Sequence, residues 1–107
     1  MHVHQMEVKT AFLNSDLGVD IYMQQPHQYV DARCLADFFC KLKKSLYGLK
    51  QSSRIWNKKI DGFMISLSFD KFESYHYAYV MCKVNEGIEG NLLFAVPYVD
   101  DHIIACN

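Results

Sequence analysis

The residues best suited to chemistry are two adjacent aspartates near the end of the chain, Asp100 and Asp101. They follow Tyr98 and Val99 between two apolar runs, which predicts a tight strand–turn–strand. Two carboxylates in apolar surroundings are unfavourable unless a positive charge lies against them, and a divalent cation accepts carboxylate oxygens as ligands. The alternative is an ordinary solvated turn, because aspartate is a common turn residue.

A third carboxylate, Glu7, lies in the run QMEVKTAF with apolar neighbours on both sides. If residues 2–8 and 91–106 form neighbouring strands of one sheet, Glu7 would converge with Asp100 and Asp101. Three converging carboxylates are what two-metal phosphoryl transfer requires, because one ion activates the attacking hydroxyl and the other stabilises the leaving group. The hypothesis therefore depends on this strand pairing.

Basic residues are concentrated in one segment, 38–60, which contains no acidic residue. It holds seven of the eleven lysines and arginines, namely Lys41, Lys43, Lys44, Lys50, Arg54, Lys58 and Lys59. Such an asymmetry fits a footprint for a phosphate backbone. A solvated helix or strand face is the alternative explanation. His2 and His4 share a strand face, but two ligands at a chain end are a weak metal signal.

Composition excludes several classes of protein. The chain has 107 residues, 50% hydrophobic and 21% charged, which is one domain at most and too apolar for a disordered chain. A formal net charge of −1 excludes a globally basic nucleic-acid binder. No apolar run approaches the roughly 20 residues of a membrane span, and the first residues do not resemble a signal peptide. We expect an intracellular, soluble single domain or a piece of one, with no membrane partner.

The four cysteines show no C-x-x-C spacing, so neither a zinc ribbon nor a redox motif is expected. Free thiols are the default for Cys34, Cys40, Cys82 and Cys106.

Hydrophobic periodicity predicts an α+β domain with one main helix. Alternating and β-branched runs predict strands, and a 3.6-residue period predicts the helix. The predicted elements are strands at 2–8, 19–24 and 38–44, a helix at about 51–67, strands at 75–84 and 91–99, and a last strand at 102–106. Residues 85–90 would join the two aromatic strands as an antiparallel hairpin.

The predicted helix has one apolar stripe, and a serine at its start, Ser52 or Ser53, is expected to cap it. The stripe consists of Trp56, Ile60, Phe63, Met64 and Leu67. Trp56 is expected to anchor the helix in the core. Met23, Met64 and Met81 are expected to fill the core as well.

Three runs of sequence resemble the reverse transcriptase of copia-type LTR retrotransposons. They are QMEVKTAFLNSDLGVDIYMQQP, CKLKKSLYGLKQSSRIW and YVDDHIIA, and together they span nearly the whole chain with the spacing of that family. The resemblance implies a partial polymerase palm with part of the fingers and a YVDD hairpin. Thumb, connection, ribonuclease H and integrase, the other parts of such a Pol polyprotein, are expected to lie outside these 107 residues.

The resemblance also implies roles for individual residues in RNA-directed DNA polymerisation with Mg²⁺, or alternatively Mn²⁺. Glu7, Asp100 and Asp101 would be catalytic and would bind metal, with the Val8 carbonyl completing the shell. The remaining roles are nucleotide binding by Phe12, Tyr47, Gly48 and Gln51, and template or primer binding by Lys50, Arg54 and Tyr98. Partners would be an RNA template, a DNA primer, deoxynucleoside triphosphates and the rest of the polyprotein, in cytoplasmic virus-like particles.

Several positions depart from the pattern of the family. Glu7 stands in place of the first catalytic aspartate, which moves the carboxylate outward by one methylene. Further departures are Gln28 and Cys106 in place of glycine, Ser53 in place of proline, and Pro97 just before YVDD. We therefore expect the chain alone to be inactive. The alternative hypothesis is a non-catalytic relic of a retroelement, or a weak nucleic-acid-binding fragment.

Overall fold

The computed structural model describes residues 1–30, 32, 33, 38–83 and 90–107. Within them a five-stranded antiparallel sheet has the strand order β1-β7-β6-β5-β4, and a separate two-stranded ribbon pairs β2 with β3. The elements are β1 (His2–Glu7), the 3-10 helix η1 (Ala11–Asn14), β2 (Tyr22–Gln24), β3 (Phe39–Lys41), α1 (Ser52–Ser66), β4 (Asp70–Lys71), β5 (Tyr79–Lys83), β6 (Asn91–Tyr98) and β7 (Asp101–Cys106). The predicted combination of an antiparallel sheet with one main helix is confirmed.

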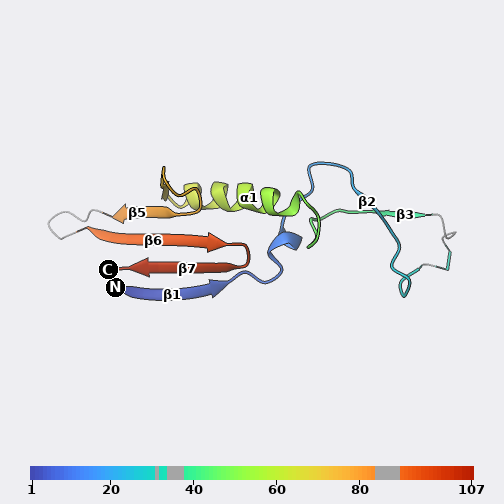
Figure 1. Ribbon diagram of the computed structural model, residues 1–107, viewed down its shortest axis with the longest axis horizontal. Helices are drawn as coiled ribbons and strands as arrows, with labels where there is room; N and C mark the ends of the chain where they lie inside the picture. The colour runs from blue at the N-terminus through green and yellow to red at the C-terminus, as the bar shows by residue number, and fades with distance from the viewer. Residues whose placement is uncertain (31, 34–37, 84–89) are drawn as a thin grey trace.

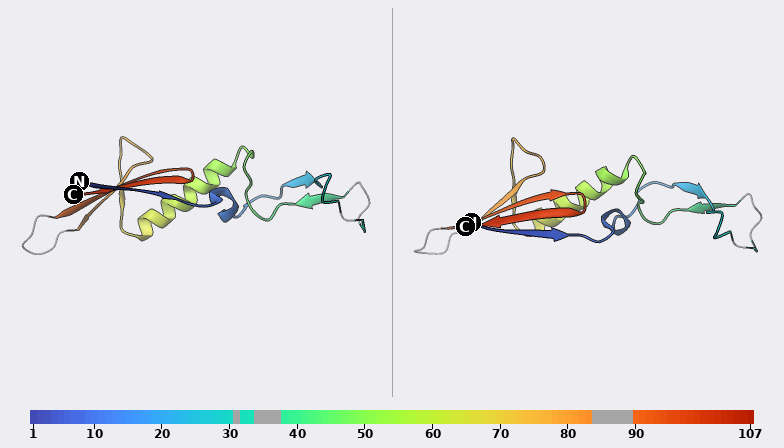
Figure 2. Two further views of the ribbon diagram at one scale, coloured as in Figure 1. Left: turned by 90° about the horizontal axis from the view of Figure 1, so that it is seen from below. Right: turned by 60° about the horizontal axis from the view of Figure 1, so that its bottom comes forward.

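The chain is elongated, with extents of 69 × 23 × 22 Å. Helix α1 crosses one face of the five-stranded sheet obliquely (Figure 2), and the β2–β3 ribbon projects from the end opposite the two termini (Figure 1). The molecule therefore has a sheet-and-helix body and a thin extension.

The predicted strand pairing is confirmed: β1 lies against β7, and β7 forms a hairpin with β6. The strands predicted at 19–24 and 38–44 shrink to three residues each. The strand predicted at 75–84 begins only at Tyr79, because a turn closes before it with the Ala78 N–H donating to the Tyr75 carbonyl at 3.0 Å. The predicted loop at 85–90 lies outside the described residues except for Gly90.

One strand was missed by the sequence analysis. The two-residue β4 pairs with the start of β5 at the edge of the sheet. Its residues, Asp70 and Lys71, are charged and too few to show an alternating pattern.

Helix α1 buries a narrower stripe than the sequence predicts. Trp56, Ile60 and Met64 are buried against the sheet, whereas Phe63 is 56% exposed and Leu67 is 45% exposed. The predicted stripe is therefore only partly buried, because Phe63 and Leu67 line the open apolar cavity beneath α1 instead of packing tightly against the sheet. The buried apolar residues are Ala11, Trp56, Ile60, Met64, Phe69, Tyr79 and Ala95.

The start of α1 is stabilised differently from the prediction. No serine side chain caps it: Gln51 is the N-cap residue and makes no side-chain capping bond. Ser52 is instead buried, and its hydroxyl donates to the Leu46 carbonyl at 2.5 Å while it accepts from the Ser45 hydroxyl at 2.5 Å. These bonds fix the turn before the helix.

The methionine and cysteine predictions are confirmed in part. Met64 is buried and Met81 packs against the core, but Met23 is exposed on the β2–β3 ribbon, where there is no core to fill. Cys40, Cys82 and Cys106 are free thiols, as expected, and Cys34 lies outside the described residues.

Helix α1 is tied to the sheet edge by a polar cluster of Asp61, Lys71 and Tyr79. The Lys71 ammonium donates to both Asp61 oxygens at 2.7 and 2.8 Å, and the Tyr79 hydroxyl donates to the same carboxylate. The hydrogen bond from Lys71, followed by that from Tyr79, lowers the pKa of Asp61 below its usual value. Burial and the bond to Asp61 raise the pKa of Tyr79.

The cluster predicts a pH dependence of stability. Because the pKa of Asp61 is depressed in the folded state, its stabilisation is present above the carboxyl pKa of the unfolded chain, about 4. It is lost as pH falls from there through the folded pKa. Urea unfolding of the chain between pH 6 and 3 should show this loss, and Asp61→Asn should flatten the profile. An equal acid-side slope in Asp61→Asn and in a control, Asp70→Asn, would contradict this assignment.

Candidate active site

Glu7, Asp101 and Tyr98 form a row across three strands. Glu7 of β1 lies directly opposite Asp101 of β7, which lies opposite Tyr98 of β6. Directly opposed residues project from the same face of a sheet. That face is the one turned away from α1, because Ala95, three residues before Tyr98, is buried on the α1 side.

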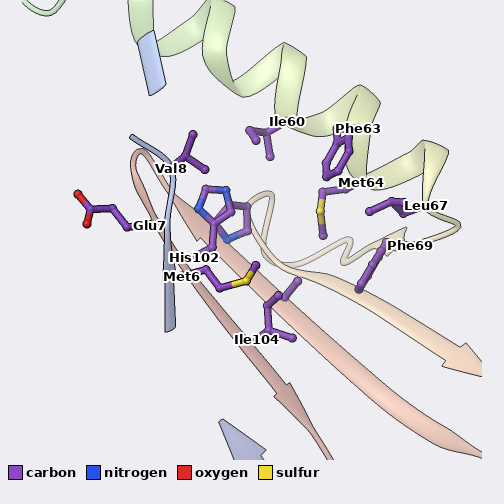
Figure 3. Close-up of a pocket in the computed structure, with 12 residues that line it drawn as sticks. Met6, Glu7, Val8, Ile60, Phe63, Met64, Leu67, Phe69, His102 and Ile104 are labelled. Atoms are coloured by element: carbon purple, nitrogen blue, oxygen red, sulfur yellow. The ribbon is translucent and has the colours of Figure 1, made fainter. Parts of the chain in front are cut away.

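The opposite face of the same strands borders an apolar cavity of about 390 Å³ beneath α1. Figure 3 shows the His102 ring directed into this cavity, together with Met6 and Ile104, while the Glu7 carboxylate points away from it. Neither ring nitrogen of His102 has a hydrogen-bond partner among the described residues, although both are buried. The charged row and the apolar face therefore occupy opposite sides of one sheet.

Asp100 lies in the two-residue turn between β6 and β7, next to the row but outside it. The turn is strained, because Val99 adopts a φ of 48° that is unfavourable for a β-branched residue. Two hydrogen bonds hold it: the Trp56 indole N–H donates to the Val99 carbonyl at 2.8 Å, and the Val8 N–H donates to the Asp100 carbonyl at 2.7 Å.

Tyr47 contacts Asp100 directly. Its hydroxyl lies 2.9 and 3.0 Å from the two carboxylate oxygens and donates to them. Its ring packs against Phe12 with the centroids 4.6 Å apart. Desolvation and the bond to Asp100 raise the pKa of Tyr47. Of the residues predicted to bind nucleotide, Phe12 and Tyr47 are therefore brought together beside Asp100.

Gly48 and Gln51 complete the predicted nucleotide-binding set. Gly48 has a φ of 94°, where a side chain would be strained, so glycine is needed to turn the chain after Tyr47. Gln51 is half-buried at the start of α1. Of the predicted template or primer contacts, Lys50 and Arg54 are exposed at this same end of the helix, and Tyr98 is 78% exposed.

Some of the basic residues of segment 38–60 bind groups of this chain, and for others the described residues show no such contact. Lys41 pairs with Asp20 at 2.8 Å, Lys44 pairs with Asp16, and Lys59 donates to the Asn14 carbonyl. The bond from Lys44 lowers the pKa of Asp16. These three lysines therefore neutralise or bind this chain's own groups. The other basic residues of the segment are also exposed: Lys43, Lys50 just before α1, and Arg54 and Lys58 on α1.

Two of the three carboxylates, Glu7 and Asp101, are placed where a divalent cation could lie between them. Glu7 and Asp101 are like charges placed directly opposite each other, which is destabilising without a cation between them. Gln5 donates to Asp101 at 3.4 Å, a weak compensation. No group of three histidine, cysteine or acidic side chains in the described ranges is arranged to hold a metal, His2 and His4 included.

The comparisons with known proteins identify the class. The whole chain, residues 1–107, matches the family of reverse transcriptases, the RNA-dependent DNA polymerases. The chain belongs to this family.

Individual members of the family show which transposons the chain resembles. It is 41% identical over 104 residues to the retrovirus-related Pol polyprotein from transposon TNT 1-94 of Nicotiana tabacum, covering 97% of this chain and 8% of the relative. It is 31% identical over 105 residues to the Pol polyprotein from transposon RE1 of Arabidopsis thaliana, covering 98% and 7%. A putative transposon Ty5-1 protein of Saccharomyces cerevisiae is 36% identical over 100 residues, covering 94% and 30%. The resemblance to copia-type reverse transcriptases is confirmed.

The chain spans less than a tenth of the two plant polyproteins. No solved structure matches it. Among the described helices, none is long and apolar enough to cross a membrane.

Two contacts of the site escaped the sequence analysis. Trp56 was expected only as a core anchor, and Tyr47 only as a nucleotide contact. No spacing signal reveals that they bond to the turn, because 43 and 53 residues separate the partners.

Trp56→Phe should loosen the strained turn. The substitution leaves the partly buried Val99 carbonyl without its donor, which costs about 1 kcal/mol in the free energy of unfolding. Hydrogen exchange should accelerate at the amides of residues 99–101. The control Ile60→Val removes one methylene from the same helix face and should leave exchange at these amides unchanged. Equal exchange in both variants would show that the indole does not hold the turn.

Proposed function

We propose that this chain supplies the catalytic centre of an RNA-directed DNA polymerase, transferring deoxynucleotides to a primer 3′ end with two divalent metal ions. The cross-strand row of Glu7, Asp101 and Tyr98, with Asp100 in the adjoining turn, supports this most directly. In this proposal the five-stranded sheet and α1 are the palm, β6–β7 is the YVDD hairpin, and the β2–β3 ribbon is part of the fingers.

The chemistry follows from which face each group occupies. The open sheet face carries the carboxylates that would hold Mg²⁺ or Mn²⁺, which would lower the charge on the attacking hydroxyl and on the leaving pyrophosphate. Glu7, Asp100 and Asp101 would be the side-chain ligands, with the Val8 carbonyl beside them. Tyr98 would lie at the primer end. Phe12, Tyr47, Gly48 and Gln51 would border the nucleotide.

The partners follow from the same proposal. They are an RNA template, a DNA primer, deoxynucleoside triphosphates, and the integrase and ribonuclease H parts of the polyprotein. The site of action would be a cytoplasmic virus-like particle. We also propose that the 107-residue chain alone does not polymerise, because Glu7 stands in place of the first catalytic aspartate and carries its carboxylate one methylene further out.

Primer extension tests the proposal. Residues 1–107 would replace the matching stretch of the tobacco TNT 1-94 polyprotein. Extension should be weak, because a carboxylate misplaced by about 1 Å costs on the order of 10²-fold in rate. Glu7→Asp should recover that factor, while the control Glu73→Asp, an exposed carboxylate elsewhere, should change nothing. No extension by the Glu7→Asp chimera, with the parent polyprotein active, would contradict the proposal.

A second candidate function is nucleic-acid binding without catalysis. The observation that favours it is that the described carboxylates do not form a three-ligand group. The exposed cations Arg54 and Lys58 of α1, with Lys50 just before it, would then contact phosphates while the metal chemistry is lost.

The salt dependence of binding to single-stranded RNA tests which basic residues contact phosphates. Replacing Lys50, Arg54 and Lys58 with alanine should lower the slope of log K against log salt by about 2, since each phosphate contact contributes about 0.7. Lys41→Ala with Lys44→Ala is the matched control, because these lysines are already paired with aspartates. A larger drop in the control pair would reverse the assignment.

A further inference from the structure

We propose that Tyr47 is a positioning residue that holds the Asp100 carboxylate out of the metal site until a divalent cation displaces it. The inference rests on the proposed function, because it concerns how the proposed metal ligands are assembled. It assigns to Tyr47 a role on Asp100 in addition to contact with the nucleotide.

The contact engages both oxygens of the carboxylate, because the single hydroxyl proton of Tyr47 is shared between them. The Tyr47 hydroxyl lies at nearly equal distances from both Asp100 oxygens, 2.9 and 3.0 Å. An ionised carboxylate accepts hydrogen bonds through the same lone pairs that coordinate metal ions. A cation and the Tyr47 hydroxyl therefore compete for Asp100.

The position of Tyr47 is set by its own surroundings. Gly48, with its φ of 94°, turns the chain directly after it. On the other side the Phe12 ring packs against it at 4.6 Å and a 41° interplanar angle. The phenol is thus held toward Asp100 by contacts that do not involve the carboxylate.

The position of Asp100 is set separately. Its carbonyl accepts the Val8 N–H at 2.7 Å, and the preceding carbonyl accepts the Trp56 indole. The backbone of the turn is therefore fixed next to β1, and the side chain of Asp100 is held separately by the Tyr47 hydroxyl. Rotation of one side chain away from Tyr47 is the movement that would bring Asp100 to Glu7 and Asp101.

Mn²⁺ binding to the 107-residue chain, measured by electron paramagnetic resonance, tests the competition. Tyr47→Phe removes the hydroxyl and retains the ring against Phe12. It should tighten Mn²⁺ binding about tenfold, because the cation no longer has to displace a hydrogen bond to a charged group. In an Asp100→Asn background the same substitution should have no effect. Tyr75→Phe, an exposed tyrosine elsewhere, is the matched control.

The outcomes separate this inference from the proposed function. Weaker binding in Glu7→Gln and Asp101→Asn supports the metal site itself, and unchanged binding in both contradicts the proposed function. Unchanged or weaker binding in Tyr47→Phe, with those two variants impaired, overturns the inference alone. As a second measurement, Mg²⁺ should shift the ring NMR signals of Tyr47 in the unmodified chain. Signals that do not move at saturating Mg²⁺ would also overturn it.

Discussion

The antiparallel register of β1, β7 and β6 is the constraint on which the site depends. Side chains alternate along a strand, so a slip of one residue would turn Glu7 or Asp101 toward α1 and bring apolar neighbours to the open face. The register is fixed because the other face must be apolar. There Ala95, Met6 and Ile104 face Ile60 and Met64 of α1. The packing of one helix thus determines where the carboxylates lie, although the helix contributes none of them.

The site breaks two local rules, and the strained turn is held by specific contacts. Glu7 and Asp101 oppose each other as like charges, and Val99 adopts a left-handed conformation in the turn. Such strain persists only where the surroundings over-determine it, and it concentrates at functional sites. Trp56 holds the turn from α1, and Tyr47 holds the carboxylate that the turn presents. Trp56 of α1 and Tyr47 of the preceding segment therefore both contact the turn that carries Asp100.

The sequence predicted what depends on periodicity and on family spacing. The pairing of residues 2–8 with 91–106 and the helix at 51–67 both follow from such patterns. What it missed depends on the relative orientation of elements. Phe63 and Leu67 share the stripe of Met64 but are exposed. Their exposure depends on how α1 crosses the sheet, which the pattern of a single helix does not reveal. The pairing of Lys41 and Lys44 with Asp20 and Asp16, and the bond from Tyr47 to Asp100, likewise join segments distant in sequence.

Paramagnetic broadening by Mn²⁺ in the amide NMR spectrum of the chain tests the central claim most directly. The claim is that the row on the open sheet face, with the adjoining turn, binds the divalent cation. Broadening at low Mn²⁺ should therefore centre on residues 7, 100 and 101 and reach residue 98 across the strands. The terminal histidines, His2 and His4, lie on the other face and at the far end of β1. Broadening centred on them, with residues 100 and 101 unaffected, would contradict the account.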